Sequence, residues 1–297
     1  MDGCQIPVAL IGVGRWGQVL AKSLPDDLGL AAVCDLDSER GTAVAERYGV
    51  DWYLDLQDAI ADVEAVLVAV PASQHFAVAC QVIEAGKHVF VEKPAATSIG
   101  QCRTYQELLI PGQILQVGHE WVYDENVRWL IRCVQTGELG EIRYILGRWL
   151  NWGIVREDVD AFWNLAMHPV SILVEMFPDL AIDWRACVGD GIAVLTGCGE
   201  PVVDIVMGWY HQRKVRQLLV VGTEKAASWD DLSPYQLRVM EYGDMETRTP
   251  VLQQEYTTVE AELRAFARAI RSGSEPRTGI THLTKVTAIL EVACAQV

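Results

Sequence analysis

The sequence predicts an α/β protein of two domains: an N-terminal doubly wound parallel sheet, and a C-terminal α+β domain with a large, mostly antiparallel open sheet. Short apolar runs alternate with amphipathic segments in the first third of the chain. Longer strand-like stretches separated by Gly-containing turns begin after about residue 140. We therefore place one domain at residues 1–120 and another at residues 121–297, and we leave open whether the closing helix at 280–295 packs back on the first.

The apolar runs of the first domain have the length of strands. Several are apolar at consecutive positions, which is typical of parallel strands covered on both faces. Helices are predicted between them: one after the first glycine turn, one that Ser38 caps and Gly49 ends, and one from His75 to Ala85 that Gly86 ends. Strands alternating with helices form right-handed βαβ units. The predicted strands are Val8–Val13, Leu30–Cys34, Ala65–Val70, His88–Val91 and Ile114–Val117.

The second domain opens with a helix that Asp124 caps. A helix-like segment, Phe162–Phe177, precedes most of the strands, and helices at Val259–Arg271, ended by Gly273, and Ile280–Ala295 close the chain. The strand-like stretches predict an antiparallel meander. They are Ile142–Asn151, Arg185–Val188, Ile192–Gly197, Val202–Tyr210 and Arg216–Gly222.

Composition and charge exclude several classes of function. The chain has 24 Lys+Arg against 40 Asp+Glu, a net charge of −16, which argues against binding nucleic acid or anionic membranes. None of the 8 Cys forms a CxxC pair or stands at metal-ligand spacing beside histidines, so we expect free thiols in a reducing cytoplasm and no metal site. No apolar run approaches the ~20 residues of a membrane span, and no signal-peptide pattern is present.

The segment VALIGVGRWGQVLAKSL carries Gly12, Gly14 and Gly17 as GxGxxG, between a buried strand and a helix. Gly12 permits a tight turn, Gly14 lets a phosphate approach the backbone, and Gly17 lets the helix pack on the sheet. Asp35 ends the next strand 18 residues later, where a carboxylate bonds the adenosine ribose and repels a 2′-phosphate. The pattern predicts a Rossmann domain that binds NAD rather than NADP; a glycine turn without a ligand is the alternative.

A second constellation, VAVPASQHFAVACQVIEAGKHVFVEKPAATS, holds Pro71, His75 and the triplet Glu92-Lys93-Pro94. Open α/β sheets bind ligands outside the carboxyl ends of their strands. Lys93 directly follows a predicted strand, so it is placed where a nicotinamide and its substrate would meet. Taken alone, Lys93 is better explained as an exposed loop lysine.

With these motifs the sequence resembles the Gfo/Idh/MocA oxidoreductases, which include glucose-fructose oxidoreductase and inositol dehydrogenase. GVGRWG, VPASQH, EKP, VGHEWVYDENVRWL, GELGEIRYI and ELRAFARAIRSGSEPRTG match family segments in order, over nearly the whole chain. REDVDAFWNLAMHPVSIL is most similar to a subgroup whose members often act on nucleotide-linked sugars. The resemblance implies cofactor contacts from Gly12, Gly14, Arg15, Trp16, Gly17, Asp35, Pro71, His75, Glu92 and Lys93.

The resemblance also implies the catalytic residues. A lysine in an EKP-like motif and an Asp-x-x-x-His motif complete the site in that family; Lys93 matches the first, and Asn164 and His168 occupy the second. Asn164 stands where the family has Asp, so it keeps hydrogen bonding and loses the negative charge. Pro169 follows His168; a proline kinks the interior of a helix but is tolerated in its first turn.

The activity so implied is hydride transfer between a secondary alcohol of a sugar, polyol or nucleotide-sugar and NAD. His168 is the expected base and Lys93 the expected stabiliser of the alkoxide, with the two roles exchangeable, and Asn164 the orienting group. A noncatalytic NAD or sugar sensor of the same fold is the main alternative, which Asn164 and Pro169 favour. A reductase of another substrate class, such as the biliverdin reductases, is a third. In relatives the open sheet packs on another subunit, which implies a homodimer or homotetramer.

Overall fold

The computed structural model describes residues 5–152, 155–234, 236–243, 247–248, 252 and 254–295. The chain divides into two compact units: residues 1–120 with 256–284, and residues 121–255 with 285–297. This division departs from the expected assignment of all residues after 120 to the second domain. The reason is packing: helix α9 (Thr258–Ser272) buries Val259, Leu263 and Phe266 in a core of the first unit.

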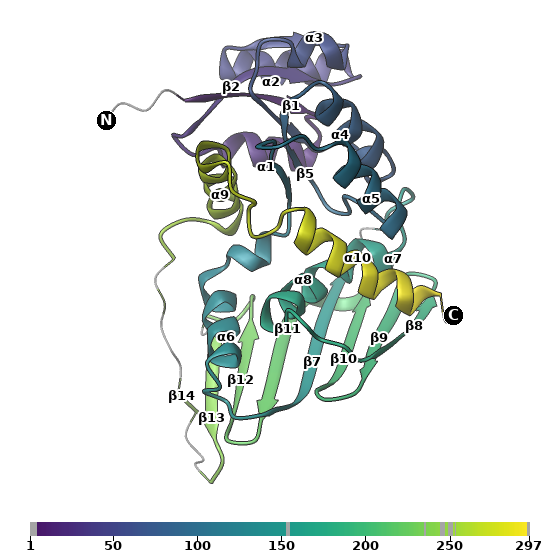
Figure 1. Cartoon of the computed structure of the whole chain (residues 1–297), viewed down its shortest axis with the longest axis vertical. Helices are drawn as coiled ribbons and strands as arrows, with labels where there is room; N and C mark the ends of the chain where they lie inside the picture. Colours follow the sequence, from purple (N-terminus) through teal and green to yellow (C-terminus); the bar gives the residue numbers. More distant parts are fainter. Residues whose placement is uncertain are drawn as a thin grey trace. The chain divides into compact units, whose positions relative to one another are not determined.

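The first unit contains a six-stranded sheet in the order β3-β2-β1-β4-β5-β6, with every neighbouring pair parallel. Figure 1 labels three of its strands, β1, β2 and β5. The strand order reverses between β1 and β4, as in a doubly wound sheet, so the fold class predicted for this part is confirmed. The strands are β1 (Ile6–Ile11), β2 (Leu28–Cys34), β3 (Asp51–Tyr53), β4 (Ala65–Val68), β5 (His88–Val91) and β6 (Leu115–Val117).

The consecutive apolar residues of β1 serve both faces of this sheet. Val8 and Leu10 belong to a core with α9, whereas Ala9 and Ile11 belong to a separate core on the opposite face. Successive side chains of a strand point to opposite faces, so a strand buried on both sides must be apolar at every position. The helices of the unit, besides α9, are α1 (Arg15–Lys22), α2 (Ser38–Tyr48), α3 (Leu56–Ile60), α4 (His75–Glu84) and α5 (Ile99–Leu108).

The prediction for α2 was right for the residue that ends the helix and wrong for the residue that caps its start. Asp37, not Ser38, is the N-cap of α2, because the Asp37 carboxylate accepts the amide of Arg40 and Ser38 already lies in the first turn. Gly49 ends the helix in the left-handed conformation, with φ of 69°, as predicted for a glycine C-cap.

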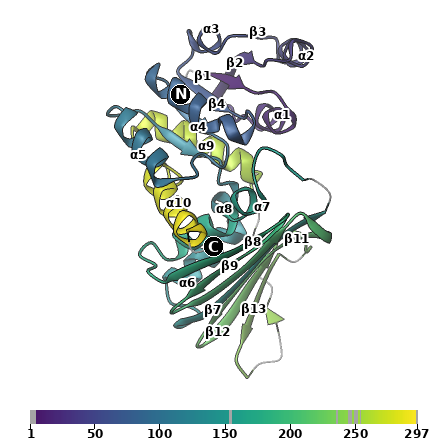
Figure 2. The same ribbon diagram turned by 90° about the vertical axis from the view of Figure 1, so that its right-hand side faces the viewer.

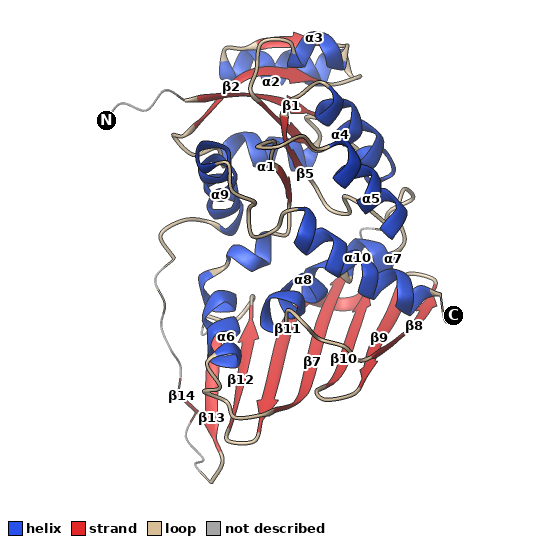
Figure 3. Ribbon diagram, in the orientation of Figure 1, coloured by secondary structure: helices blue, strands red, loops and turns tan. Residues whose placement is uncertain are grey.

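The second unit contains an eight-stranded sheet in the order β14-β13-β12-β11-β7-β10-β9-β8 (Figure 3). The prediction of a mostly antiparallel open sheet is confirmed, but the simple meander is wrong. The first strand, β7, lies between β11 and β10 and pairs parallel with β10. The strands are β7 (Ile142–Trp152), β8 (Asp183–Gly189), β9 (Ile192–Cys198), β10 (Val202–Gly208), β11 (Tyr210–Gly222), β12 (Lys225–Asp230), β13 (Leu237–Glu241) and β14 (Thr247–Arg248).

Helices cover one face of this sheet. Figure 2 shows α6 (Glu125–Gln135) and α8 (Met167–Met176) on that face, and the structure describes no helix on the other. Asp124 caps α6 as predicted, accepting the amides of Asn126 and Val127 at 2.9 and 3.0 Å. The last helix, α10 (Ile280–Cys294), spans the division of the chain: Leu283 lies in a core of the first unit and Leu290 in the core of the second.

Candidate functional site

The glycine turn after β1 has the geometry of a phosphate-binding loop. Gly12 has φ of 86°, and a Cβ there would lie 2.7 Å from the carbonyl oxygen of Ala69. A Cβ on Gly17 would lie 2.0 Å from the carbonyl oxygen of Gly12, so any side chain would push α1 off the turn. At Gly14, by contrast, a Cβ would meet nothing within 4 Å, and no side chain caps α1. The helix N-terminus therefore offers amide donors and open space to an anion.

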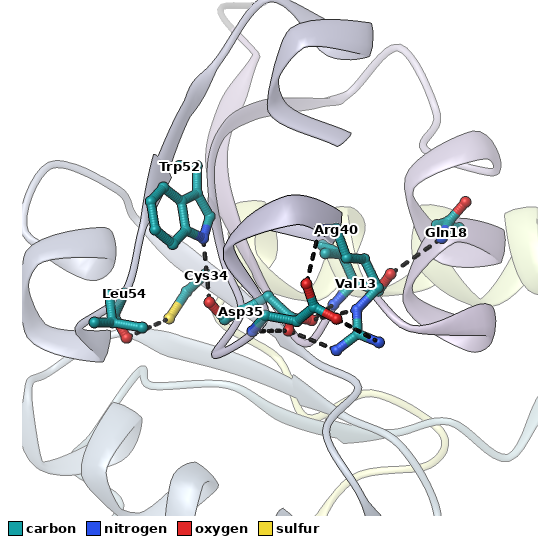
Figure 4. A network of polar contacts seen from close by, with 8 residues as sticks. Val13, Gln18, Cys34, Asp35, Arg40, Trp52 and Leu54 are labelled. Atoms are coloured by element: carbon teal, nitrogen blue, oxygen red, sulfur yellow. Dashed lines mark hydrogen bonds and ion pairs between the residues drawn. The ribbon is translucent and has the colours of Figure 1, made fainter. Parts of the chain in front are cut away.

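Asp35 lies at the end of β2 and is almost fully buried, at 8% exposure. Its Oδ2 accepts the amide of Val13 at 2.8 Å, and its Oδ1 accepts the amide of Asp37 at 2.9 Å (Figure 4). The guanidinium of Arg40 donates to the same two oxygens, at 3.3 Å from Nε and 2.7 Å from Nη2. Burial alone would raise the pKa of Asp35, but these hydrogen bonds outweigh it and hold the pKa below its usual range.

This network makes Asp35 a preorganised anion beside the glycine turn. The two backbone amides fix the direction of the carboxylate, and one comes from Val13, inside the turn itself. The Arg40 side chain is 44% exposed, so it can exchange its bonds to Asp35 for bonds to solvent or ligand at little cost. The arrangement fits the pair of vicinal hydroxyls on an adenosine ribose.

The Glu92-Lys93-Pro94 turn follows β5 directly, and the Lys93–Pro94 peptide is cis. His75, at the start of α4, braces this turn. Its ring Nδ1 lies 3.0 Å from the Pro94 carbonyl oxygen, and Nε2 lies 2.8 Å from that of Val70. The ring is buried, so its contacts fasten the ends of two neighbouring strands to each other. Pro71 precedes a short turn of 3-10 helix and is exposed.

Glu92 connects the two turns. Its carboxylate accepts the Lys93 amide at 3.3 Å, and the indole of Trp16, from the glycine turn, lies close enough to lower its pKa. The side chain is 5% exposed. Burial raises the pKa of Glu92 to about 7, although Trp16 and the charge of Lys93 oppose the shift. Arg15, the other predicted neighbour, is exposed at the start of α1.

Sequence reasoning missed a group of buried polar residues in the same unit. The rings of His119 and His282 lie with centroids 5.3 Å apart, and both are almost fully buried. Burial, then the charges of His282 and Lys93, lower the pKa of His119 well below its usual value, so it is neutral. Glu262 is fully buried on α9. The sequence could have indicated Glu262, because it falls on the apolar face of a predicted helix, between Val259 and Leu263. A carboxylate is rarely found on such a face.

Asn164 and His168 lie in the second unit and are each 8% exposed. The predicted single helix over residues 162–177 is instead two, α7 (Ala161–Leu165) and α8, separated at Ala166. Pro169 explains the break, because without an amide hydrogen it cannot bond back to a continuous helix. It occupies the first turn of α8, where no amide bond is lost, and His168 is retained in that turn. Lys93, in contrast, belongs to the first unit.

Two absences concern only the described part of the chain. No group of three or more His, Cys, Asp and Glu side chains there is arranged to hold a metal ion. Among the helices within the described ranges, none has both the length and the apolar character needed to cross a bilayer.

The parallel sheet, the glycine turn and Asp35 define a dinucleotide-binding domain of the Rossmann class. Residues 6–119 match the model of the GFO_IDH_MocA family, an oxidoreductase family with an NAD-binding Rossmann fold. Over this part of the chain the sequence matches the Gfo/Idh/MocA oxidoreductases.

Individual relatives agree with this assignment. A 2,7-anhydro-N-acetylneuraminate hydratase of Mediterraneibacter gnavus is 34% identical over 142 residues, 46% of this chain and 37% of its own. The scyllo-inositol 2-dehydrogenase (NAD(+)) of Bacillus subtilis is 32% identical over 150 residues, 48% of this chain and 44% of its own. The matched segments thus span about half or less of these curated relatives. A solved inositol dehydrogenase homolog from Azotobacter vinelandii, complexed with NADH and myo-inositol, has a TM-score of 0.87 at 18% identity, covering 98% of this chain and 95% of that one, which shows a shared fold.

Proposed function

We propose that this protein is an NAD-dependent dehydrogenase that transfers a hydride between a secondary alcohol of a sugar, polyol or nucleotide-sugar and the nicotinamide. The observation that carries the proposal is the anchored turn at the end of β5. Lys93 there follows a buried carboxylate that accepts the Lys93 amide and lies near Trp16 of the glycine turn. A cation held beside a dinucleotide loop at the carboxyl end of the sheet is well placed to act on a bound alcohol.

The chain's own residues supply binding and proton transfer. Bound NAD would supply the hydride acceptor at this site. The amides at the start of α1 bind the pyrophosphate and Asp35 binds the adenosine ribose. His168 takes the hydroxyl proton and passes it to solvent, while the Lys93 ammonium donates a hydrogen bond to the oxygen as its negative charge develops. The Asn164 amide orients the substrate hydroxyl.

NAD is the expected cofactor rather than NADP. Asp35 is held ionised, and a phosphate on the adenosine ribose would face this buried anion at short range. Arg40 moderates the repulsion, because its guanidinium already bonds both carboxylate oxygens. We therefore expect a preference for NAD rather than a strict exclusion of NADP.

We further propose that the open face of the eight-stranded sheet joins two or four copies of the chain. Half-buried apolar side chains from its central strands lie on the face that the described helices leave uncovered. They are Tyr144, Leu146, Val194, Val206, Leu219 and Val221. An exposed apolar face of a sheet is stabilised when another protein surface buries it, and a second copy of the chain would do so here. The proposed setting is a cytoplasm, which suits the 7 described cysteines, none of which forms a disulfide. The proposed partners include no nucleic acid and no membrane.

A noncatalytic sensor remains the second candidate, and Asn164 is the observation that favours it. An amide cannot take a proton or stabilise the positive charge of Lys93, as the Asp of the resembled family can. Binding of NAD and of a sugar would persist without turnover.

Hydride transfer tests the proposal. Purified protein is incubated with NAD or NADP and with inositols, hexoses and UDP-sugars, and the absorbance of reduced nicotinamide is followed. We expect turnover with NAD that falls by roughly 10²–10⁴-fold in Lys93→Ala and in His168→Ala, and is unchanged in the exposed-lysine control Lys22→Ala. No turnover over the whole panel, with NAD binding intact, would replace the dehydrogenase with the sensor; Asn164→Asp would then be the variant expected to gain activity.

A further inference from the structure

Glu262 is a buried carboxylate for which the proposed chemistry has no use. It is fully buried on the inner face of α9, and neither of its oxygens accepts a hydrogen bond from any group in the described part of the chain. Its backbone carbonyl is held firmly, accepting the Gln116 side-chain amide of β6 at 2.8 Å. A carboxylate in such a place is costly if ionised, so a specific partner or a proton is required.

Glu92 is the natural partner. Its Oε2 faces the Lys93 amide, but its Oε1 is buried and accepts no hydrogen bond from the described residues. Gly118 at the end of β6 makes room for it: a Cβ there would lie 2.9 Å from Oε1. The end of β6 borders both acids: the Gln116 side chain bonds the Glu262 carbonyl and, two residues further on, a Cβ at Gly118 would meet Glu92 Oε1. After burial, the charge of Glu92 is the next cause that raises the pKa of Glu262 well above its usual value.

The remaining charged groups around the pair do not relieve Glu262. Glu120 adds a second negative charge that raises the pKa of both carboxyls. Lys93 acts on Glu92, where it lowers the pKa, and His119 beside Lys93 is neutral. The cheapest arrangement is one proton shared between two acids, as carboxylates at close quarters do not both ionise.

We propose that Glu262 is a positioning residue: it carries a proton at neutral pH and donates it to Glu92, whose ionised carboxylate can then hold Trp16 of the glycine turn and the Lys93 amide together. A hydrogen bond donated by the Glu262 carboxyl group on α9 orients the Glu92 carboxylate and leaves its negative charge in place. Loss of the Glu262 proton at alkaline pH would place two anions side by side, and the Glu92 bridge between the two turns would loosen. The inference bears on cofactor binding and does not require turnover, so it can fail independently of the proposed dehydrogenase.

The proton itself is tested by infrared spectroscopy. A protonated carboxylic acid has a carbonyl stretching band that an ionised carboxylate lacks. We expect the band in the wild-type protein at pH 7 and its loss in Glu262→Gln, with no such loss in Glu46→Gln, an exposed glutamate of α2. Identical spectra for wild type and Glu262→Gln at pH 7 would overturn the proposal.

The positioning role is tested by NAD binding as a function of pH. Gln has the shape of a protonated Glu and keeps a neutral hydrogen-bond donor. The Kd of Glu262→Gln for NAD should therefore be within about twofold of the wild-type Kd at pH 7. At alkaline pH the wild-type Kd should rise, whereas that of Glu262→Gln should not. Glu262→Leu keeps volume without a donor and should bind NAD roughly tenfold more weakly, at a melting temperature that shows it folded. If Glu262→Leu fails to fold, the pH profile of Glu262→Gln decides: an alkaline limb like that of wild type contradicts the role.

Discussion

Asp35→Asn tests the residue on which cofactor choice depends. In the protein as it stands, each oxygen of Asp35 accepts one backbone amide and one guanidinium N–H. Asn keeps one acceptor oxygen, turns the other into a donor and removes the charge. NAD binding should therefore weaken and NADP binding should strengthen, the latter because a 2′-phosphate no longer faces an anion.

The magnitude follows from the hydrogen bonds exchanged. A bond to an ionised group contributes roughly 1.5–3 kcal/mol and a neutral one roughly 0.5–1.5, so the substitution costs about 1 kcal/mol for each of two ribose hydroxyls. Binding of the ribose displaces the Arg40 bonds to Asp35, which reduces this difference in binding free energy only slightly. The Arg40 side chain is 44% exposed, and an exposed ion pair contributes about 0.5 kcal/mol. The net loss of about 2 kcal/mol corresponds to roughly a 30-fold rise in the Kd for NAD.

Calorimetric titration with NAD and with NADP measures both effects. Glu39→Gln is the matched control, since it removes one exposed negative charge from the first turn of α2 without touching Asp35. A thermal melt checks that Asp35→Asn is folded. The reasoning is refuted if Asp35→Asn and Glu39→Gln show the same Kd for NAD and the same ratio of NADP to NAD affinity.

Three further predictions concern stability and pH. Gly17→Ala should lower the melting temperature strongly, since its Cβ would meet the Gly12 carbonyl at 2.0 Å, whereas Gly14→Ala should leave the melt unchanged and weaken NAD binding; equal melts would contradict the packing. Asp124→Ala should lower the free energy of unfolding by about 1 kcal/mol in urea titrations, because the cap of α6 accepts two amides. The pKa of Glu92 is raised to about 7 because burial disfavours its charged form. The free energy of unfolding should therefore be higher at pH 4, where Glu92 is protonated, and should fall as the pH rises through 7. Glu92→Gln should flatten that part of the pH profile, and an unchanged slope would contradict the shift.

Much of the first unit was predictable because its constraints are local. The GxGxxG spacing follows from the turn that Gly12 makes and from the contact between Gly17 and the Gly12 carbonyl. Strand β5 coincides with the predicted range because every residue of it is apolar or half-buried, and Asp124 acts as the cap its position indicates.

The remainder depends on contacts between distant residues. The parallel pairing of β7 with β10 could not be read from the chain, because the pattern of a strand gives its buried face and not its neighbour. Short elements such as α3, five residues capped by Asp55, carry too little periodicity to predict. Glu262 shows the opposite case: the sequence displayed an acid on an apolar helix face, but only the fold brings it to the end of β6, where the carboxylate of Glu92 also lies.

The transfer of deuterium tests the dehydrogenase assignment most directly. An alcohol active in the panel is prepared with deuterium on its carbinol carbon and incubated with NAD and excess protein, and the nicotinamide is analysed by mass spectrometry. Direct hydride transfer predicts that the reduced nicotinamide carries the deuterium, and that Lys93→Ala lowers the rate of its appearance by a larger factor than it raises the Kd for NAD. Reduced nicotinamide that carries no deuterium, or a rate equal in wild type and Lys93→Ala, would contradict it.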